Sequence, residues 1–134
     1  MDLLQRYIQS NSGKVSQMTN AEIMKRYNEL KSVSGVTGIL GWYVYKNMKI
    51  LADAVEPYMQ AHNDLVRKYG GSETEEVPKE NRAAFGTESM LLLGCETDIV
   101  MDRMPRVQFE QMIRSDKTMT AETMYILDRN IAEE

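Results

Sequence analysis

The sequence predicts a mainly helical α+β fold. It should contain a helical hairpin with one long helix kinked at a proline, a short strand or β-hairpin, and further helices toward the C-terminus. Three observations predict this fold. Apolar residues recur at helical spacing in several separate segments. A Thr-x-x-Glu capping box precedes the first of these segments. Residues 95–101 alternate between polar and apolar side chains, which is typical of a strand.

The length and composition indicate one domain behind a short N-terminal arm. The chain has 134 residues, of which 43% are apolar, and this is enough to bury a core. Residues 1–18 begin with a short apolar pattern and continue as SNSGKVSQ, which is typical of a loop or linker. We expect an arm over 1–18 that frays or docks on the body. A single helical domain should follow over 19–134, made of a hairpin (19–69), an acidic loop (70–81) and a small α+β part (82–134).

The first helix of the hairpin is predicted by its cap. The hydroxyl of Thr19 should accept a hydrogen bond from the backbone N–H of Glu22, and the Glu22 side chain should reach back. Ser34-Gly35 then ends the helix, because glycine adopts the backbone conformations that terminate helices. One helical face carries its apolar residues, which are Ile23, Tyr27 and Leu30.

A longer second helix is expected over about 38–69. Thr37 is a suitable N-cap, apolar residues recur along the whole segment, and Gly70-Gly71 ends it. Pro57 lies inside this helix. Because proline removes one backbone hydrogen bond and clashes with the preceding turn, we expect a bend there. The short connection between the two helices predicts that they pack antiparallel.

The remaining segments predict an exposed loop, a helix and a strand. Residues 70–81 combine Gly, Pro and carboxylates without an apolar period, so we expect an exposed loop. Residues 81–93 predict a third helix, which Gly94 ends. Residues 95–101 follow as a strand with Ile99 and Met101 on one side.

The expected strand needs a partner, because a lone strand leaves its backbone groups unpaired. The candidates are the 104–109 segment, another chain or a binding partner. Residues 106–114 predict a short helix or a second strand, and Thr120 should cap a last helix.

Composition and charge exclude several classes of protein. The net charge of −4 and the pI near 5.1 argue against direct binding of nucleic acid, which needs clustered Lys and Arg. No segment approaches the roughly 18 consecutive apolar residues of a membrane span. The N-terminus lacks the basic start and apolar block of a signal peptide, and the single cysteine fits a reducing compartment. We therefore expect a cytoplasmic protein without a membrane partner.

The charge is unevenly distributed between the two halves of the chain. Residues 1–69 carry nine Lys/Arg and six Asp/Glu, whereas residues 70–134 carry seven and fourteen. This asymmetry is compatible with two ordinary solvated surfaces. The functional alternative is an acidic face that docks on a basic partner, where charge would raise the association rate and select the partner.

The sequence contains no catalytic or metal-binding motif. One His and one Cys cannot build a Cys/His zinc site within one chain. We expect His62 at the surface and Cys95 as a small buried apolar residue, with a Cys–His catalytic pair as the alternative. Carboxylate pairs such as Glu75-Glu76 and Asp98/Asp102 arise by chance among 20 acidic residues. We therefore expect no enzymatic activity, no metal and no cofactor.

Two groups of side chains suggest a protein-binding surface. Trp42 and Tyr45 share a helix face that is offset from the core stripe and lies beside Lys46 and Lys49, as suits an interface. The alternative is that this helix is buried on two sides. Carboxylates of the 72–80 loop and the following strand could dock on a basic surface. The partner-binding candidates are Trp42, Tyr45, Glu73, Glu75, Glu76, Glu80, Glu96, Asp98 and Asp102.

Four short motifs follow one another along the chain: Tyr43-x-x-Lys46-Asn47, Leu65-x-x-Lys68-Tyr69-Gly70, Glu80-Asn81 with Phe85, and Thr120-Ala121-Glu122. Their order resembles that in a group of small, uncharacterised helical proteins encoded by tailed phages and prophages of Gram-positive bacteria. The likeness covers about residues 19–131 and rests on pattern. The resemblance implies a phage origin and a helical core, but it implies no reaction and transfers no catalytic residue.

Two functional hypotheses follow from these features. The first is a non-enzymatic, phage-encoded inhibitor of a host defence effector, of the anti-CRISPR type, that binds a basic protein surface. The second is a chaperone or scaffold for phage tail or head assembly that holds an apolar segment. The partner would be a host or phage protein, and a homo-oligomer remains open. Salt separates the two hypotheses, because an acidic interface weakens with ionic strength and an apolar one does not.

Overall fold

The computed structural model describes residues 12–134, and the chain there is mainly helical with a two-stranded antiparallel sheet. The predicted α+β class is therefore confirmed, whereas the apolar pattern predicted near the N-terminus lies outside the described residues. The elements in chain order are β1 (Ser12–Thr19), α2 (Asn20–Ser32), α3 (Gly38–Lys68), the 3₁₀ helix η1 (Lys79–Asn81), α4 (Arg82–Leu93), β2 (Glu96–Asp102), α5 (Arg106–Ser115) and α6 (Ala121–Ile131).

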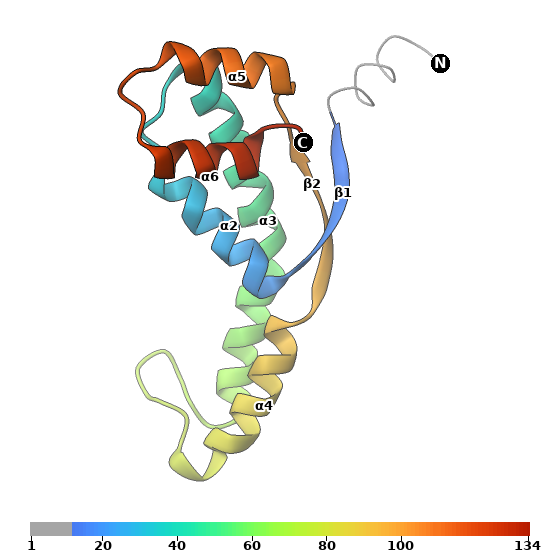
Figure 1. The fold of residues 1–134 in the computed structure, drawn as a ribbon. Helices are drawn as coiled ribbons and strands as arrows, with labels where there is room; N and C mark the ends of the chain where they lie inside the picture. Colours follow the sequence, from blue (N-terminus) through green and yellow to red (C-terminus); the bar gives the residue numbers. More distant parts are fainter. Residues whose placement is uncertain (1–11) are drawn as a thin grey trace.

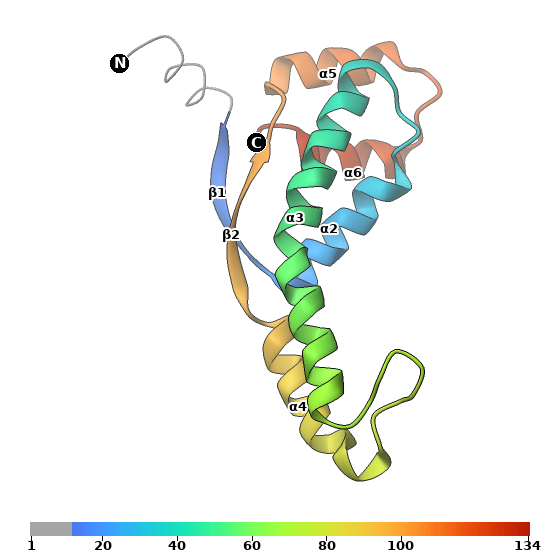
Figure 2. The same cartoon turned by 180° about the vertical axis from the view of Figure 1, so that it is seen from behind.

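The described chain has two parts that share the long helix α3. At one end, α2, α5, α6, the first half of α3 and the β1–β2 ribbon gather into a body (Figures 1 and 2). At the other end, α4 runs beside the second half of α3, and the loop between them closes a hairpin that projects from the body (Figure 1). We call residues 55–94 the distal hairpin.

The helices α2 and α6 begin at the threonine caps that the sequence predicts. The Thr19 hydroxyl accepts from the Glu22 N–H at 3.1 Å, and the Thr120 hydroxyl accepts from the Thr123 N–H at the same distance. The Glu22 carboxylate does not reach back to Thr19 as expected, because it accepts instead from Arg26 at 2.8 Å and from Arg129 at 3.0 Å. An arginine offers a charge-assisted bond, which is stronger than a bond to a neutral N–H.

The long helix α3 continues without interruption through Pro57. It therefore spans both parts of the structure, as its predicted length required. At its start, Thr37 occupies the N-cap position, but its side chain makes no capping hydrogen bond. Gly38 follows with a φ of 68°, a left-handed conformation that glycine adopts without strain.

The prediction of a loop over SNSGKVSQ is wrong for the described residues, because they form the strand β1. β1 pairs antiparallel with β2 from Thr19↔Glu96 to Ser12↔Asp102, with a register irregularity between Ser12 and Val15. The 104–109 segment is not the strand partner, since residues 106–115 form α5. The sequence of β1 does not indicate a strand, because it has no regular apolar face: Met18 is buried, but Val15 is 64% exposed. The strand therefore depends on pairing with a distant segment.

The core of the body contains two polar side chains that are completely shielded from solvent. Asn47 of α3 and Asn130 of α6 are fully buried. The Asn47 amide donates to the carbonyls of Asp102 (2.8 Å) and Asn130 (3.1 Å), and its Oδ1 accepts from the Asp102 N–H at 2.8 Å. Asn47 therefore joins α3, β2 and α6. The fully buried apolar residues around the two asparagines include Ile23, Leu30, Val44, Leu51, Met104, Leu127 and Ile131.

Candidate protein-interaction site

The distal hairpin is held together by one side of α4. The Phe85 ring lies 6.0 Å from His62 and 6.2 Å from Tyr69, measured between ring centroids. The Glu88 carboxylate accepts from Lys68 at 2.5 Å and from the Tyr69 hydroxyl at 2.7 Å. These two hydrogen bonds lower the pKa of Glu88, so this carboxylate stays ionised and cross-links α4 to the end of α3.

The opposite side of α4 faces solvent and carries no charge. No residue of α4 is buried, although the helix is rich in apolar side chains. Met90 is 70% exposed and Leu91 is 68% exposed. Exposed Ala83, Ala84 and Thr87 continue the same face toward the N-terminus of the helix, at the three- and four-residue spacings of one helical side. We call these five residues the α4 outer face.

The α4 outer face is chemically simple. Its one polar side chain, Thr87, donates its hydroxyl hydrogen to the Ala83 carbonyl at 3.1 Å, within the helix. The side chains in the first half of the face are small, whereas Met90 and Leu91 in the second half are large. An uncharged, exposed helix side of this kind is typical of a surface that another protein covers.

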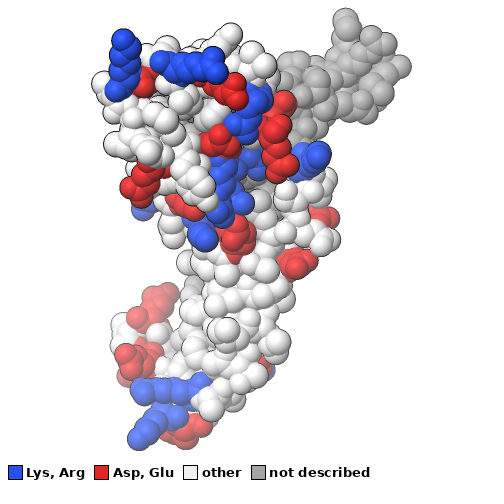
Figure 3. All heavy atoms as spheres, in the orientation of Figure 1, with Lys and Arg blue, Asp and Glu red and all other residues white. Residues whose placement is uncertain are grey.

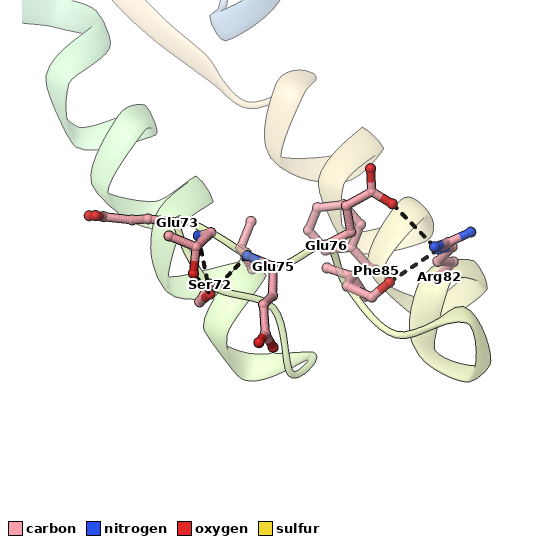
Figure 4. A pocket seen from close by; sticks show the side chains of 9 residues that line it. Ser72, Glu73, Glu75, Glu76, Arg82 and Phe85 are labelled. Atoms are coloured by element: carbon pink, nitrogen blue, oxygen red, sulfur yellow. Dashed lines mark hydrogen bonds and ion pairs between the residues drawn. The ribbon is translucent and has the colours of Figure 1, made fainter.

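The acidic loop lies at the tip of the same hairpin and is ordered by its own hydrogen bonds. The Ser72 hydroxyl accepts from the backbone N–H groups of Thr74 (3.2 Å) and Glu75 (3.0 Å). At the other end of the loop, Arg82 donates to the Val77 carbonyl (3.1 Å) and to Glu76 (3.3 Å) (Figure 4). These contacts fix the loop against α4.

A cavity of about 570 Å³ lies between this loop and the two helices (Figure 4). Val66, Val77 and Phe85 supply apolar walls. The remaining lining is polar and consists of Ser72, Glu73, Thr74, Glu75, Glu76 and Arg82. Glu76 lies toward Arg82, whereas Glu73 and Glu75 extend away from it and form no ion pair with any residue of 12–134 (Figure 4). An apolar cavity beside unpaired carboxylates has the chemistry to accept the stem and the charged end of a lysine or arginine.

The predicted partner-binding residues lie in three separate places. Glu73, Glu75, Glu76 and Glu80 are in or beside the tip loop, and exposed Glu96 and Asp98 lie on β2. Asp102, at the end of β2, forms an ion pair with Lys46 at 3.0 Å. Acidic and basic side chains are interspersed on the face of the body that Figure 3 shows. The acidic half of the sequence therefore does not form one continuous acidic surface on that face.

The two aromatic candidates lie on the body, at the opposite end of α3 from the distal hairpin. Trp42 is 50% exposed and Tyr45 is 59% exposed, so this side of α3 is not buried. The Lys46 ammonium lies 4.1 Å from the centre of the Trp42 ring, and the Tyr45 hydroxyl donates to the Ser34 carbonyl at 3.1 Å. These contacts hold both rings against their own helix and loop.

Among the described residues, no hydrogen bond joins His62 to Cys95, and the two side chains contact different residues. His62 is half-buried and packs between the rings of Tyr58 (5.9 Å) and Phe85 (6.0 Å). The expectation of a buried Cys95 is wrong, because this residue is exposed just after α4 and its thiol lies 3.4 Å from the Leu91 carbonyl. Within residues 12–134, no group of three His, Cys, Asp or Glu side chains is arranged to hold a metal ion.

Sequence reasoning missed the α4 outer face. The prediction of a helix over residues 81–93 did not assign that helix a second apolar side. The available signal was composition: RAAFGTESMLLL contains two charged residues, and apolar residues fall on more than one side of it. A helix that is apolar on several sides is either buried or covered by a partner.

Comparison with known proteins adds no relative. No family model, curated protein or solved structure matches this chain. Among the described residues, no helix is long and apolar enough to cross a membrane.

Proposed function

We propose that this protein is a non-enzymatic interaction protein that binds another protein through the α4 outer face. The observation that supports this proposal is the uncharged, solvent-exposed side of α4, with Met90 and Leu91 about two-thirds exposed. Fully burying a side chain of this size contributes about 1.5–3 kcal/mol. A few buried residues usually dominate the energy of an interface, and Met90 and Leu91 would supply such a centre.

The chemistry of the face defines the partner. It offers no charge to pair and no free polar group, so the partner surface must be apolar over the same length. The small residues at its N-terminal half leave room for large side chains, and Met90 and Leu91 need a complementary recess. An amphipathic helix of the partner, packed along α4, meets these requirements.

An apolar docking face supports the chaperone or scaffold hypothesis more than the charge-driven inhibitor. In this proposal the protein holds an apolar helical segment of a phage structural protein in the bacterial cytoplasm. The phage origin and the cytoplasmic location are part of the proposal, and both rest on the resemblance and on composition.

Inhibition of a host defence effector is the second candidate function. It is favoured by the cavity at the loop tip, where unpaired Glu73 and Glu75 border apolar walls. A basic side chain of the effector would insert there. This contact shares the distal hairpin with the α4 outer face, but its strength would fall steeply with salt.

Affinity capture with matched variants tests the proposal. The tagged protein is incubated with lysate of infected and uninfected host cells and washed at low and high salt. Leu91→Lys places a charge on the α4 outer face, and Val107→Lys is the control, since Val107 of α5 is also 68% exposed. We expect a phage structural protein that survives the salt wash, is retained by Val107→Lys and is lost with Leu91→Lys.

Other outcomes contradict this proposal in distinct ways. A host effector that elutes with salt and is lost with Glu73→Lys/Glu75→Lys, but not with Leu91→Lys, would support the inhibitor instead. If Leu91→Lys and Val107→Lys both still capture the partner, the α4 outer face is not part of the interface. Light scattering provides a further check, because a dimer that Leu91→Lys dissociates would identify the partner as a second copy of this chain.

A further inference from the structure

Four arginines from distant parts of the sequence line one cavity in the body. The cavity has a volume of about 530 Å³ and lies between β1, α2, the segment after β2 and the end of α6. Arg26 belongs to α2 and Arg129 to α6. Arg103 lies directly after β2, and Arg106 is the first residue of α5. The carboxylates that line the same cavity are Glu22, Asp128 and Glu134.

Three of the arginines are drawn together by the C-terminal end of α6. Arg26 Nη1 and Arg103 Nη1 donate to the same oxygen, the Arg129 carbonyl, at 3.3 and 2.8 Å. Arg103 Nη1 also donates to the Ala132 carbonyl at 3.0 Å, and Arg106 Nε donates to the Glu133 carbonyl at 2.7 Å. The last carbonyls of a helix lack partners within the helix and carry negative partial charge, so guanidinium groups are favourable there.

Three of the four arginines, Arg26, Arg106 and Arg129, form ion pairs with carboxylates. Both terminal nitrogens of Arg106 donate to Asp128, at 2.7 and 3.1 Å. Arg129 Nη2 donates to Glu22 at 3.0 Å, and its Nε lies 3.4 Å from Glu29. Glu22 also accepts from Arg26 Nε at 2.8 Å, so this carboxylate is shared between two arginines.

Arg103 has no such partner. Within residues 12–134, it is the one arginine that forms no ion pair, although it is half-buried among other arginines. Burial lowers the pKa of Arg103 most, and the charges of Arg26 and Arg106 also lower it, whereas the charges of Glu134 and Asp128 raise it. Its Nε and Nη2, together with Nη2 of Arg26, make no hydrogen bond to the described residues. A desolvated charge without a counter-ion is costly, and an anion would relieve that cost.

We propose that this cavity binds the phosphate group of a small phosphate ester, held between the free guanidinium edges of Arg103 and Arg26. Two guanidinium groups that share one carbonyl oxygen can both reach a single tetrahedral oxyanion, and guanidinium–phosphate hydrogen bonds are short and charge-assisted. The volume of the cavity exceeds that of a phosphate group alone, so it leaves room for the organic part of the ester. This inference does not depend on the function proposed for the distal hairpin.

Calorimetric titration of the full chain with pyrophosphate and inorganic phosphate tests the proposal. We expect saturable binding that sodium chloride at matched ionic strength does not reproduce. Arg103→Gln should weaken binding about tenfold or more, the usual loss for a hydrogen bond between charged groups. Arg114→Gln is the matched control, because Arg114 lies on the exposed side of α5 and pairs only with Glu110 at 3.9 Å, and it should leave binding unchanged.

A second variant covers the case in which Arg103→Gln fails to fold. Arg103→Lys keeps the charge but offers a point donor in place of a planar fork, and it should still weaken binding several-fold. In the wild type, phosphate should shift the NMR signals of the Arg103 and Arg26 side chains before any others. The proposal is overturned if the wild type shows no saturable binding, if chloride gives the same response, or if acetate binds as tightly as phosphate. It is also overturned if both Arg103 variants bind like the wild type.

Discussion

Asn47 should contribute more to stability than any exposed polar residue on the same helix. Asn47→Ala removes three hydrogen bonds that join α3 to β2 and α6. It leaves the Asp102 N–H and two carbonyls without these partners in a buried site. An orphaned buried group costs about 1–3 kcal/mol, and each further lost bond costs about 1 kcal/mol, so we expect a loss of roughly 3 kcal/mol. A domain is usually stable by about 5–15 kcal/mol, so the loss is substantial.

Urea denaturation followed by circular dichroism measures this loss. With a typical slope of about 1–3 kcal/mol per molar urea, the midpoint of Asn47→Ala should fall by about 1–3 M. Asn63→Ala is the control, because Asn63 lies exposed on the same helix α3. Its free energy of unfolding should change by less than about 0.5 kcal/mol. A loss below about 1 kcal/mol for Asn47→Ala would refute the idea that this side chain joins the three elements, since its hydrogen bonds would then be replaced by water.

Two further predictions concern stability. Gly41→Ala should destabilise the protein, because the new Cβ would lie 2.6 Å from the Val36 carbonyl oxygen. In Gly86→Ala the new Cβ would have no atom within 4 Å, so this variant should raise stability by about 1 kcal/mol. Equal shifts of the melting temperature for the two variants would contradict this prediction. The hydrogen bond from Arg26 lowers the pKa of Glu22 below its ordinary value in the folded protein, so the stability that it adds is present above about pH 4.5 and is lost as the pH falls further. Glu22→Gln should therefore be less stable than wild type near pH 7 but lose less stability on acidification, and parallel pH–stability curves would count against this assignment.

The elements that sequence reasoning predicted well are those fixed by neighbours in the chain. Thr19 and Thr120 start their helices through hydrogen bonds to residues three positions later. Such local signals require no knowledge of the rest of the fold. The boundaries of α2, α3, α4 and α6 therefore follow closely from caps, glycines and apolar spacing.

The strand β1 could not be predicted in this way, because its partner lies far along the chain. Its residues Lys14 to Thr19 include one buried apolar side chain, Met18, and resemble a polar linker. Pairing with β2 supplies the hydrogen bonds that make this segment a strand. The prediction that the strand over 95–101 needs a partner was sound, but the sequence offered no means to select it.

The α4 outer face and the arginine cavity could not be predicted from the sequence, for different reasons. Periodicity locates the apolar side that faces the core, but it does not show that α4 also has an apolar outer side. The arginine cavity combines residues that are far apart in sequence, such as Arg26 and Arg103, and no motif links them. Only the packing of α6 between α2 and the segment after β2 brings these charges together. The nine residues predicted to bind a partner include none of these positions.

The pairing of β1 with β2 has a consequence for how the protein matures during synthesis. When the first strand leaves the ribosome, the segment that it needs has not yet been translated, and α2 and α3 are made in between. The edge of β1 therefore stays open until Glu96–Asp102 emerges, and it could meanwhile pair with the same strand of a neighbouring nascent chain. Closing so long a loop is also slow relative to forming the helices. The ribbon of β1 and β2 should therefore form only after α2, α3 and α4 have been synthesised.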